Sequence, residues 1–444
     1  MDVGTVVKMT RCRIEQDDEL YKVLDDLRYM IYRIKNKATS MAWDWEQFSF
    51  GYHERFGEYP VAKEVVGKNV SRDAYQHVKG LGEEFSSSFV DTAVEEASKH
   101  FKNHRSAILR GKEGIPVYRS DTSFTIRHTQ IKGLKKEQRD KYSGLFTLLS
   151  PKGSKVREQA STRYLFKIRS GGSSSAILDR ILEGTYSLCD SKIVYEKKKR
   201  HYFLLVTYKF EAQKIEMNPE RVMGVDVGFA VPATIAITDN PYACHFVGDA
   251  REVLAFEQRV LGTRRALYRS RSRAGDGSRG HGRKTLMKPT EVINSKVANF
   301  KATKNHEWSK FIVDYAVRHG VSTIQLENLE KIAEESPFLK RWTYYDLQQK
   351  IAYKAKEYGI KVIRVSPDYT SARCNKCGAI HRKQERTLWR PKQSQFNCLH
   401  CHHRDHADRN AARNLAIPNI DQIIKAEKVE WTSYWTNVYK NPPA

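Results

Sequence analysis

The chain of 444 residues is long enough for two or three domains, each with its own core. Lysine and arginine (77) outnumber aspartate and glutamate (52), and the net charge of +25 indicates a polyanionic partner, for which nucleic acid is our expectation. No apolar run approaches the roughly 20 residues that span a bilayer, and the N-terminus lacks the basic and apolar regions of a signal peptide, so we expect a cytoplasmic protein with no membrane partner.

The first half of the chain is predicted to be a small β-barrel with a helical block inserted into it. A first strand is expected over 3–14, and apolar residues then recur with helical spacing over 20–34 and 85–101. Further short strands, which with the first would close a barrel, are expected at 115–118, 124–126, 164–168, 192–195 and 202–208. Most aromatic residues between the two helices are expected in the core, with one or two stacking on bases: Trp43, Trp45, Phe48, Phe50, Tyr52 and Phe56.

The second half, beyond a boundary near 212–220, is organised around the apolar strand 222–225, Asp226, a glycine turn and a second apolar strand at 233–237. Aspartate is a poor strand residue and costly beside a buried sheet, so either a turn or a functional carboxylate must explain Asp226. Two further acids have similar settings: Glu327 ends an apolar run, and Asp408 opens a strongly helical segment. Three such carboxylates can converge on one sheet edge and hold two divalent metal ions for phosphodiester hydrolysis.

Asp405 is the main competitor of Asp408 for the third position. We prefer Asp408 because Asn410, Ala411 and Ala412 follow it as they would at a helix start, where an acid near the N-terminus is stabilised.

A basic, glycine-rich stretch separates helical segments expected at about 250–270 and 290–319. It runs from Arg264 through the Gly/Ser/Arg segment 275–282 to Arg283 and Lys284. A mobile basic loop beside a carboxylate cluster suits a lid that admits nucleic acid, and a disordered linker is the alternative.

Four cysteines give the most specific local signal. Cys374, Cys377, Cys398 and Cys401 form two C-x-x-C pairs separated by a polar spacer, which is typical of a structural zinc ribbon with four thiolate ligands. A redox role for one C-x-x-C pair is a weaker interpretation, because there are two pairs. The ribbon directly precedes Asp408, so we expect it to help load a nucleic-acid strand into the cleft.

Four motifs together carry a family resemblance: V-D-V-G at 225–228, L-E-N-L at 326–329, T-S-x-x-C-x-x-C-G at 370–378 and D-R-N-A-A-R-N at 408–414. They resemble the RuvC-type nuclease core of TnpB-like proteins, and within that group the chain resembles a miniature type V-F CRISPR effector. The resemblance covers about residues 1–425. The tail 426–444, which contains Trp431 and Trp435, has no counterpart, and the ribbon spacer is long and basic.

The resemblance implies a prokaryotic, guide-RNA-directed DNA endonuclease that cuts double-stranded and also single-stranded DNA beside a short T-rich flanking motif. Asp226, Glu327 and Asp408 would be catalytic and bind two Mg²⁺ ions, which Mn²⁺ can replace, while the four cysteines would bind Zn²⁺. The guide would be a crRNA with a tracrRNA, or a fused single guide. The resemblance also implies an asymmetric homodimer on one guide RNA. Arg373, Arg283 and Lys284 are weaker candidates for nucleic-acid contacts.

The predicted fold class is multidomain α+β and α/β, in which a helical recognition lobe interrupts a wedge-like barrel and an RNase H-like RuvC domain with a zinc-ribbon insertion follows. The expected domains are the barrel at 1–16 and 112–215, the helical lobe at 17–111, the RuvC domain at 220–368 and 403–425, the ribbon at 369–402 and a tail at 426–444.

Three other functions stay open. A transposon-encoded TnpB-type nuclease shares the chemistry, although the N-terminal helical block argues for the CRISPR type. A guided DNA binder without cleavage could dispense with one carboxylate, and here all three are present. A transposase that joins DNA ends has no residue in this sequence that supports strand transfer.

Overall fold

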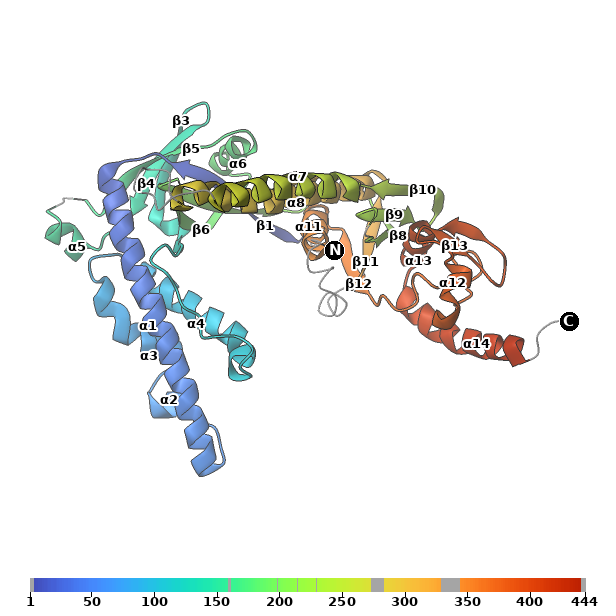
Figure 1. The fold of residues 1–444 in the computed structure, drawn as a ribbon. Coiled ribbons are helices and arrows are strands. Elements are labelled where there is room, and N and C mark those ends of the chain that lie inside the picture. The colour runs from blue at the N-terminus through green and yellow to red at the C-terminus, as the bar shows by residue number, and fades with distance from the viewer. Residues whose placement is uncertain are drawn as a thin grey trace. The chain divides into compact units, whose positions relative to one another are not determined.

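The computed structural model describes residues 4–158, 161–197, 199–213, 215–228, 230–272, 283–328 and 344–440 (Figure 1). The chain divides into two compact units: Thr5–Phe210, and Glu211–Ala444 together with the first four residues. None of the helices in the described ranges is long and apolar enough to cross a membrane.

The N-terminal unit contains a seven-stranded sheet with the order β2-β6-β7-β1-β5-β4-β3. Side chains of β5 alternate between solvent and core, so Tyr164, Phe166 and Ile168 point inward. The edge strands β2 and β3 are consecutive in the chain; closure into a barrel would need them to pair, and it stays a prediction. The strands are β1 (Thr5–Ile14), β2 (Phe124–Ile126), β3 (Ile131–Gln138), β4 (Lys141–Thr147), β5 (Arg163–Arg169), β6 (Ser187–Glu196) and β7 (His201–Glu211).

Two of the sequence predictions for these strands need correction. Residues 115–118 form no strand, and β3 and β4 were not predicted. The pattern of β3 explains the omission, because only Ile131 is buried in a strand that otherwise carries mostly charged and polar residues.

A helical block lies between β1 and β2 in the chain. Its helices are α1 (Asp18–Phe56), α2 (Ala62–Val65), α3 (Val70–Val78) and α4 (Ser87–Leu109); α5 (Pro151–Val156) and α6 (Ser173–Leu182) come later. Asp17 caps α1, since its side chain accepts a hydrogen bond from the Leu20 backbone N at 2.9 Å. The predicted apolar face of α1 is confirmed: Leu20, Val23, Leu24, Leu27, Met30, Ile31 and Ile34 are all buried.

The aromatic residues predicted to be mostly core are not buried. All six lie in the second half of α1, and Phe48, Phe50 and Phe56 are exposed by 45%, 39% and 58%. The prediction is wrong because α1 has 39 residues and a length of about 58 Å, so the core formed with α3 and α4 takes up only part of its apolar surface.

The C-terminal unit contains a five-stranded sheet with the order β10-β9-β8-β11-β12. β9 and β10 are antiparallel to their neighbours, whereas β8, β11 and β12 are parallel to one another. The predicted mixed α/β character is confirmed. The strands are β8 (Asn218–Asp226), β9 (Ala233–Ile237), β10 (Asn240–Val247), β11 (Val321–Glu327) and β12 (Lys361–Val365).

Helices of this unit are α7 (Ala250–Ser272), α8 (Arg283–Arg318), α11 (Tyr344–Ala355), α13 (Ala407–Leu415) and α14 (Ile420–Lys440). The predicted helical segments on both sides of the basic stretch are thus confirmed. The glycine-rich segment 275–282, proposed as a lid, lies outside the described residues, and so do the side chains of Arg283 and Lys284.

The cysteine-rich segment between β12 and α13 contains the helical turns η4 (Lys383–Glu385) and α12 (Arg386–Trp389). A two-stranded sheet of β13 (Gln395–Asn397) and β14 (Arg404–His406) follows. A small core of its own supports this segment, with Trp389, Phe396 and Ala407 buried among the cysteines.

Candidate active site and metal centre

Two of the predicted carboxylates lie side by side at one edge of the C-terminal sheet. β8 and β11 are parallel neighbours, and their register pairs Val225 with Leu326, so the next residues, Asp226 and Glu327, end their strands together. Both are buried, with exposures of 8% and 7%. Carboxyl ends of parallel strands are where ligands bind in open α/β sheets.

The third carboxylate reaches this edge because α13 packs directly on β8. Gly224 permits the approach: a Cβ atom at this position would lie 2.2 Å from the Ala412 carbonyl oxygen, which no side chain could tolerate. Asp408 stands in the first turn of α13. A Cβ atom at Gly228, in the turn after β8, would lie 3.8 Å from Asp408 Oδ2, so the acid faces the turn that follows Asp226.

The three carboxylates affect one another electrostatically. Burial raises the pKa of Asp226 well above its usual value, the charges of Glu327 and Asp408 raise it further, and Arg390 opposes them. Burial also raises the pKa of Glu327, against a hydrogen bond from Thr370 that lowers it. Buried carboxylates with so little compensation are costly when ionised. Hard divalent cations with oxygen ligands, such as Mg²⁺ or Mn²⁺, would supply the missing positive charge, and the donor set therefore fits them.

Buried hydrogen bonds hold Glu327 and its strand in place. The Thr370 hydroxyl donates to the Glu327 carboxylate, and Gln348 Nε2 donates to the Glu327 carbonyl at 2.8 Å. Gln325, on the same strand, donates from Nε2 to the carbonyls of Leu415 and Ile417, both at 2.8 Å. The latter bonds fix the end of α13 against β11, so the helix that carries Asp408 and the strand that carries Glu327 keep one geometry.

Asp405, the competitor for the third position, is engaged elsewhere. Its side chain is 1% exposed and forms ion pairs with Arg409 and with Arg413, the latter at 3.1 Å. It also accepts a hydrogen bond from Asn375 Nδ2 at 3.3 Å. Asp405 thus ties the start of α13 to the ribbon, whereas Asp408 lies beside the turn that follows Asp226.

We therefore expect Asp405→Asn to destabilise the protein without removing metal binding at the carboxylates. The substitution removes the ion pairs with Arg409 and Arg413, whose side chains are 41% and 28% exposed, and a hydrogen bond to a charged group contributes about 1.5–3 kcal/mol; the amide keeps the shape of the side chain. Chemical denaturation should show the loss, while calorimetric titration with Mn²⁺ should give an unchanged affinity. An Asp405→Asn variant of normal stability that no longer binds Mn²⁺ would move the third ligand to Asp405.

Sequence reasoning missed two residues at this site. Arg390, on the ribbon, has a side chain 12% exposed, and its Nη2 lies 3.7 Å from Asp408 Oδ1. Tyr344, at the start of α11, is buried, and burial together with the charges of Asp226 and Asp408 raises its pKa. Arg390 is one of several basic residues in the spacer, and nothing in the sequence distinguishes it from the others.

Arg373, predicted as a phosphate contact, is used inside the protein. It is buried, and its Nε and Nη2 donate to the Glu427 carboxylate at 2.6 and 2.7 Å, while Nη1 donates to Asn414 Oδ1 at 3.0 Å. This bidentate pair joins the ribbon to α14 and α13. The geometry assigns Arg373 a structural role, and its phosphate contact stays a prediction.

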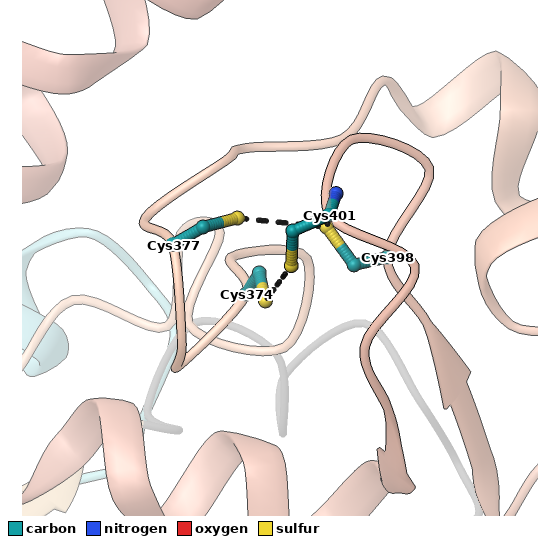
Figure 2. Close-up of side chains that lie close together, drawn as sticks. All are labelled: Cys374, Cys377, Cys398 and Cys401. Carbon is teal, nitrogen blue, oxygen red and sulfur yellow. Dashed lines mark hydrogen bonds between the residues drawn. The ribbon is translucent and has the colours of Figure 1, made fainter.

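The four predicted cysteines converge, as Figure 2 shows. The Sγ atoms of Cys374 and Cys401 are 3.9 Å apart and those of Cys377 and Cys398 are 3.6 Å apart, and none of the four forms a disulfide. A tetrahedral zinc ion with Zn–S bonds of about 2.3 Å needs sulfurs about 3.8 Å apart, so the cluster fits it. Within the described ranges this is the one group of three or more His, Cys, Asp or Glu side chains whose ligand atoms all lie within 4.8 Å of one another, so the three carboxylates are spaced more widely than the four sulfurs.

Comparisons with known proteins identify the family of this chain. The family model "Cas12f1-like, TNB domain" matches residues 344–415. The "CRISPR-associated endodeoxyribonuclease Cas12f1" of Sulfoacidibacillus thermotolerans is 38% identical over 89% of this chain and 92% of its own length. The protein of the same name from Syntrophomonas palmitatica is 31% identical over 84% of this chain and 80% of its own length. The solved "Cas12f1-sgRNA-target DNA complex" has a similar fold, with a TM-score of 0.66, 20% identity and coverage of 90% of this chain and 83% of that one.

Proposed function

This chain belongs to the Cas12f family of miniature type V-F CRISPR effectors, and on that basis we propose that it is an RNA-guided DNA endonuclease. Its relatives are named as CRISPR-associated endodeoxyribonucleases. The proposed nuclease centre is Asp226, Glu327 and Asp408, the guide is a CRISPR-derived RNA, and the substrate is DNA beside a short T-rich flanking motif.

The observation that carries the proposal is the convergence of three acids from distant parts of the chain. Asp226, Glu327 and Asp408 come from two parallel strands and a helix, yet both other acids raise the pKa of Asp226 by their charge. A protein gains no stability from burying like charges together. Such an arrangement is typical of a site whose charge is balanced by bound ions during function.

Each residue has a proposed task in the reaction. The three carboxylates would bind two divalent cations, and Thr370 would orient Glu327 toward them. The bound cations would activate a water molecule and stabilise the leaving oxygen. Arg390 lies beside Asp408. Its guanidinium would donate hydrogen bonds to a non-bridging oxygen of the scissile phosphate and neutralise the negative charge that develops there. Zn²⁺ bound to the four cysteines would keep the ribbon, and therefore Arg390, in position.

We also propose that two copies act on one guide RNA, with α1 and its neighbours as the contact surface. An apolar cavity of about 280 Å³ in this region is lined by residues that include Trp45, Phe48 and Val65. Phe48 and Val65 are exposed by 45% and 47%. Contiguous exposed apolar surface of this kind is typical of a protein interface.

Replacing two of these apolar residues by charged ones, as in Phe48→Glu with Val65→Glu, should therefore yield a monomer on the guide RNA. Light scattering of the purified protein–RNA complex would measure its mass. Val117→Glu, which changes a side chain 80% exposed elsewhere in the same unit, is the matched control. A doubly substituted complex that keeps the mass of two chains per guide would remove this surface from the proposal.

Sequencing the RNA that co-purifies with the protein, expressed beside its own genomic flank, tests the guide. A repeat-derived RNA supports the CRISPR function. RNA from a transposon end would place the protein with TnpB-type nucleases, and protein free of any discrete RNA would contradict guided action. A guided binder without cleavage is disfavoured because all three carboxylates are present and the charges of Glu327 and Asp408 both act on Asp226.

A further inference from the structure

Outside the carboxylate site, the C-terminal unit contains a cavity of about 310 Å³ between the ribbon and α14. Its lining combines flat rings with basic side chains, including Tyr369, His381, Trp431, Arg382, Lys383 and Lys428. The volume is at the lower end of the range for small-molecule sites, which is about 300–1,000 Å³. The cavity falls partly on the tail for which the family resemblance offers no counterpart.

Aromatic side chains fix the walls of the cavity. Trp435 is 4% exposed and its Nε1 donates to the Ile380 carbonyl at 2.8 Å, which holds α14 against the ribbon. The ring centroid of Trp431 lies 6.2 Å from that of Trp435, and Trp431 stays partly exposed. A rigid, half-exposed indole presents a surface on which a planar ligand can stack.

His381 adds hydrogen-bonding capacity that the protein leaves unused. The side chain is fully buried, and neither ring nitrogen has a hydrogen-bond partner among the described residues. Burial lowers its pKa to about 4, so the ring is neutral at pH 7 with one donor and one acceptor. Buried polar groups without a partner are rare, and because both nitrogens are closed off from solvent, His381 forms part of the wall behind the surface of the cavity.

The electrostatic character of the cavity favours an anionic ligand with a flat ring. The Nζ atoms of Lys428 and Lys383 lie 4.8 and 5.8 Å from the ring centroid of Tyr369. The described lining residues include Arg382 as a third cation and no carboxylate. Planar surfaces combined with clustered cations form the usual site for a nucleotide in a single strand, in which bases stack and phosphates pair with lysine or arginine.

The cavity is also close to the proposed nuclease centre along the chain. Lys383, at the cavity, begins the helical turns η4 and α12, and Arg390, beside Asp408, follows them. Helical rises of 1.5–2.0 Å per residue make this path only about 10–14 Å long. A base held in the cavity would therefore lie a few nucleotides from a phosphate at the carboxylates.

We propose that this cavity binds an unpaired base of the DNA strand that enters the nuclease centre. The base would stack on the ring of Trp431, and Lys383 and Lys428 would hold the flanking phosphates. The inference rests on the proposed function, since it assigns the occupant to the DNA substrate and not to the guide RNA. The cavity lies in the same unit as the carboxylates and is joined to them along the chain through Arg390, which favours the DNA substrate over the guide RNA as its occupant.

The test measures binding without cutting, with the full chain in EDTA and a short fluorescein-labelled single-stranded DNA. The same DNA with abasic sites should bind roughly tenfold more weakly. Trp431→Leu should bind intact DNA about tenfold more weakly than the unmodified protein does. Abasic sites should weaken the binding of this variant little further, because it has no stacking surface to lose. Trp431→Phe, which keeps a ring and apolar packing, should bind nearly as tightly as the unmodified protein.

Lys428→Ala should reduce the salt dependence of the affinity for single-stranded DNA. Lys425 is an exposed lysine of the same helix that does not line the cavity, so Lys425→Ala should reduce this salt dependence less.

Two results would overturn the inference. If base removal weakened Trp431→Leu and the unmodified protein equally, with normal zinc content and thermal midpoint in the variant, Trp431 would have no part in stacking. If single-stranded RNA of the same sequence bound tenfold tighter than DNA and carried all of the Trp431 dependence, the cavity would belong to the guide. If the protein cut DNA but Trp431→Leu and base removal weakened binding independently of each other, this site would be refuted and the nuclease function would stand. If the two changes were not independent in a protein that never cut DNA, the nuclease function alone would be refuted.

Discussion

Asp226→Asn should abolish DNA cutting while guided binding persists. The variant removes a metal-binding carboxylate from the centre of the cluster and keeps the shape of the side chain. Loss of a residue that acts as part of one catalytic unit lowers the rate by about 10³-fold or more. Affinity for DNA depends mainly on phosphate contacts made by the basic surface, so it should change little. Plasmid cleavage and a gel-shift assay on the same preparation measure both quantities.

The same substitution should raise thermal stability in EDTA. The native pKa of Asp226 is raised, so the folded protein binds this proton more tightly than the unfolded chain does. Stability of the metal-free protein therefore falls as pH rises from the ordinary aspartate pKa, near 4, toward the raised native value. Asparagine removes that penalty at neutral pH and should make no difference at acid pH, where Asp226 is protonated. Asp239→Asn, at an acid exposed by 44% and paired with Arg221, is the matched control and should keep its activity. Loss of guided binding together with cutting in Asp226→Asn would mean that the carboxylate supports the fold and not the chemistry.

Cys374→Ser has the second largest expected effect. Structural zinc sites contribute about 10–16 kcal/mol of binding energy to folding in small zinc domains, and Cys374 is a fully buried member of the four-cysteine cluster. We expect zinc content to fall from about one atom per chain to near zero and the ribbon to unfold locally. Cutting should then fall sharply, because Arg390 is held on the ribbon beside Asp408. Elemental analysis, hydrogen exchange of residues 369–402 and plasmid cleavage measure the three effects.

Cys244→Ser is the control, because Cys244 is a free, half-buried cysteine on β10 and its replacement should leave zinc content unchanged. Purified protein that cuts at full rate with no zinc would contradict a structural zinc ribbon at these cysteines.

The local sequence pattern was sufficient to predict a helix or strand where one face of that element is buried. The spacing of apolar residues in α1 and the apolar run before Glu327 predicted both elements, because burial on one helix face or in a parallel strand imposes a regular pattern. The same rule failed for β3, whose mostly charged side chains face solvent. It also failed for the aromatic residues of α1, because apolar composition alone does not distinguish a buried core from an exposed apolar surface.

The sequence pattern could not identify the roles of residues that act through tertiary contacts. Asp226 and Glu327 were predicted because each ends an apolar strand, where an acid is unexpected, and Asp408 because it stands at a helix start, where an acid is stabilised. The role of Asp405 depends on the ion pairs that α13 and the ribbon form in three dimensions. Arg373 pairs with Glu427, 54 residues away, and Arg390 meets Asp408 only after the ribbon folds. Basic residues in a basic spacer look alike in sequence, and only the structure separates them.

The most direct test of the central claim is cleavage of a plasmid by the purified protein–RNA complex in Mg²⁺, with the guide segment reprogrammed to a new sequence. Plasmids would contain the matching target beside a randomised flank, and the products would be sequenced. We predict cleavage of matched targets beside T-rich flanks, none of unmatched plasmids, and none in EDTA or with Asp226→Asn. Tight, guide-dependent binding of matched plasmid that leaves both strands intact in Mg²⁺ and in Mn²⁺ would contradict the assignment of Asp226, Glu327 and Asp408 as a nuclease centre.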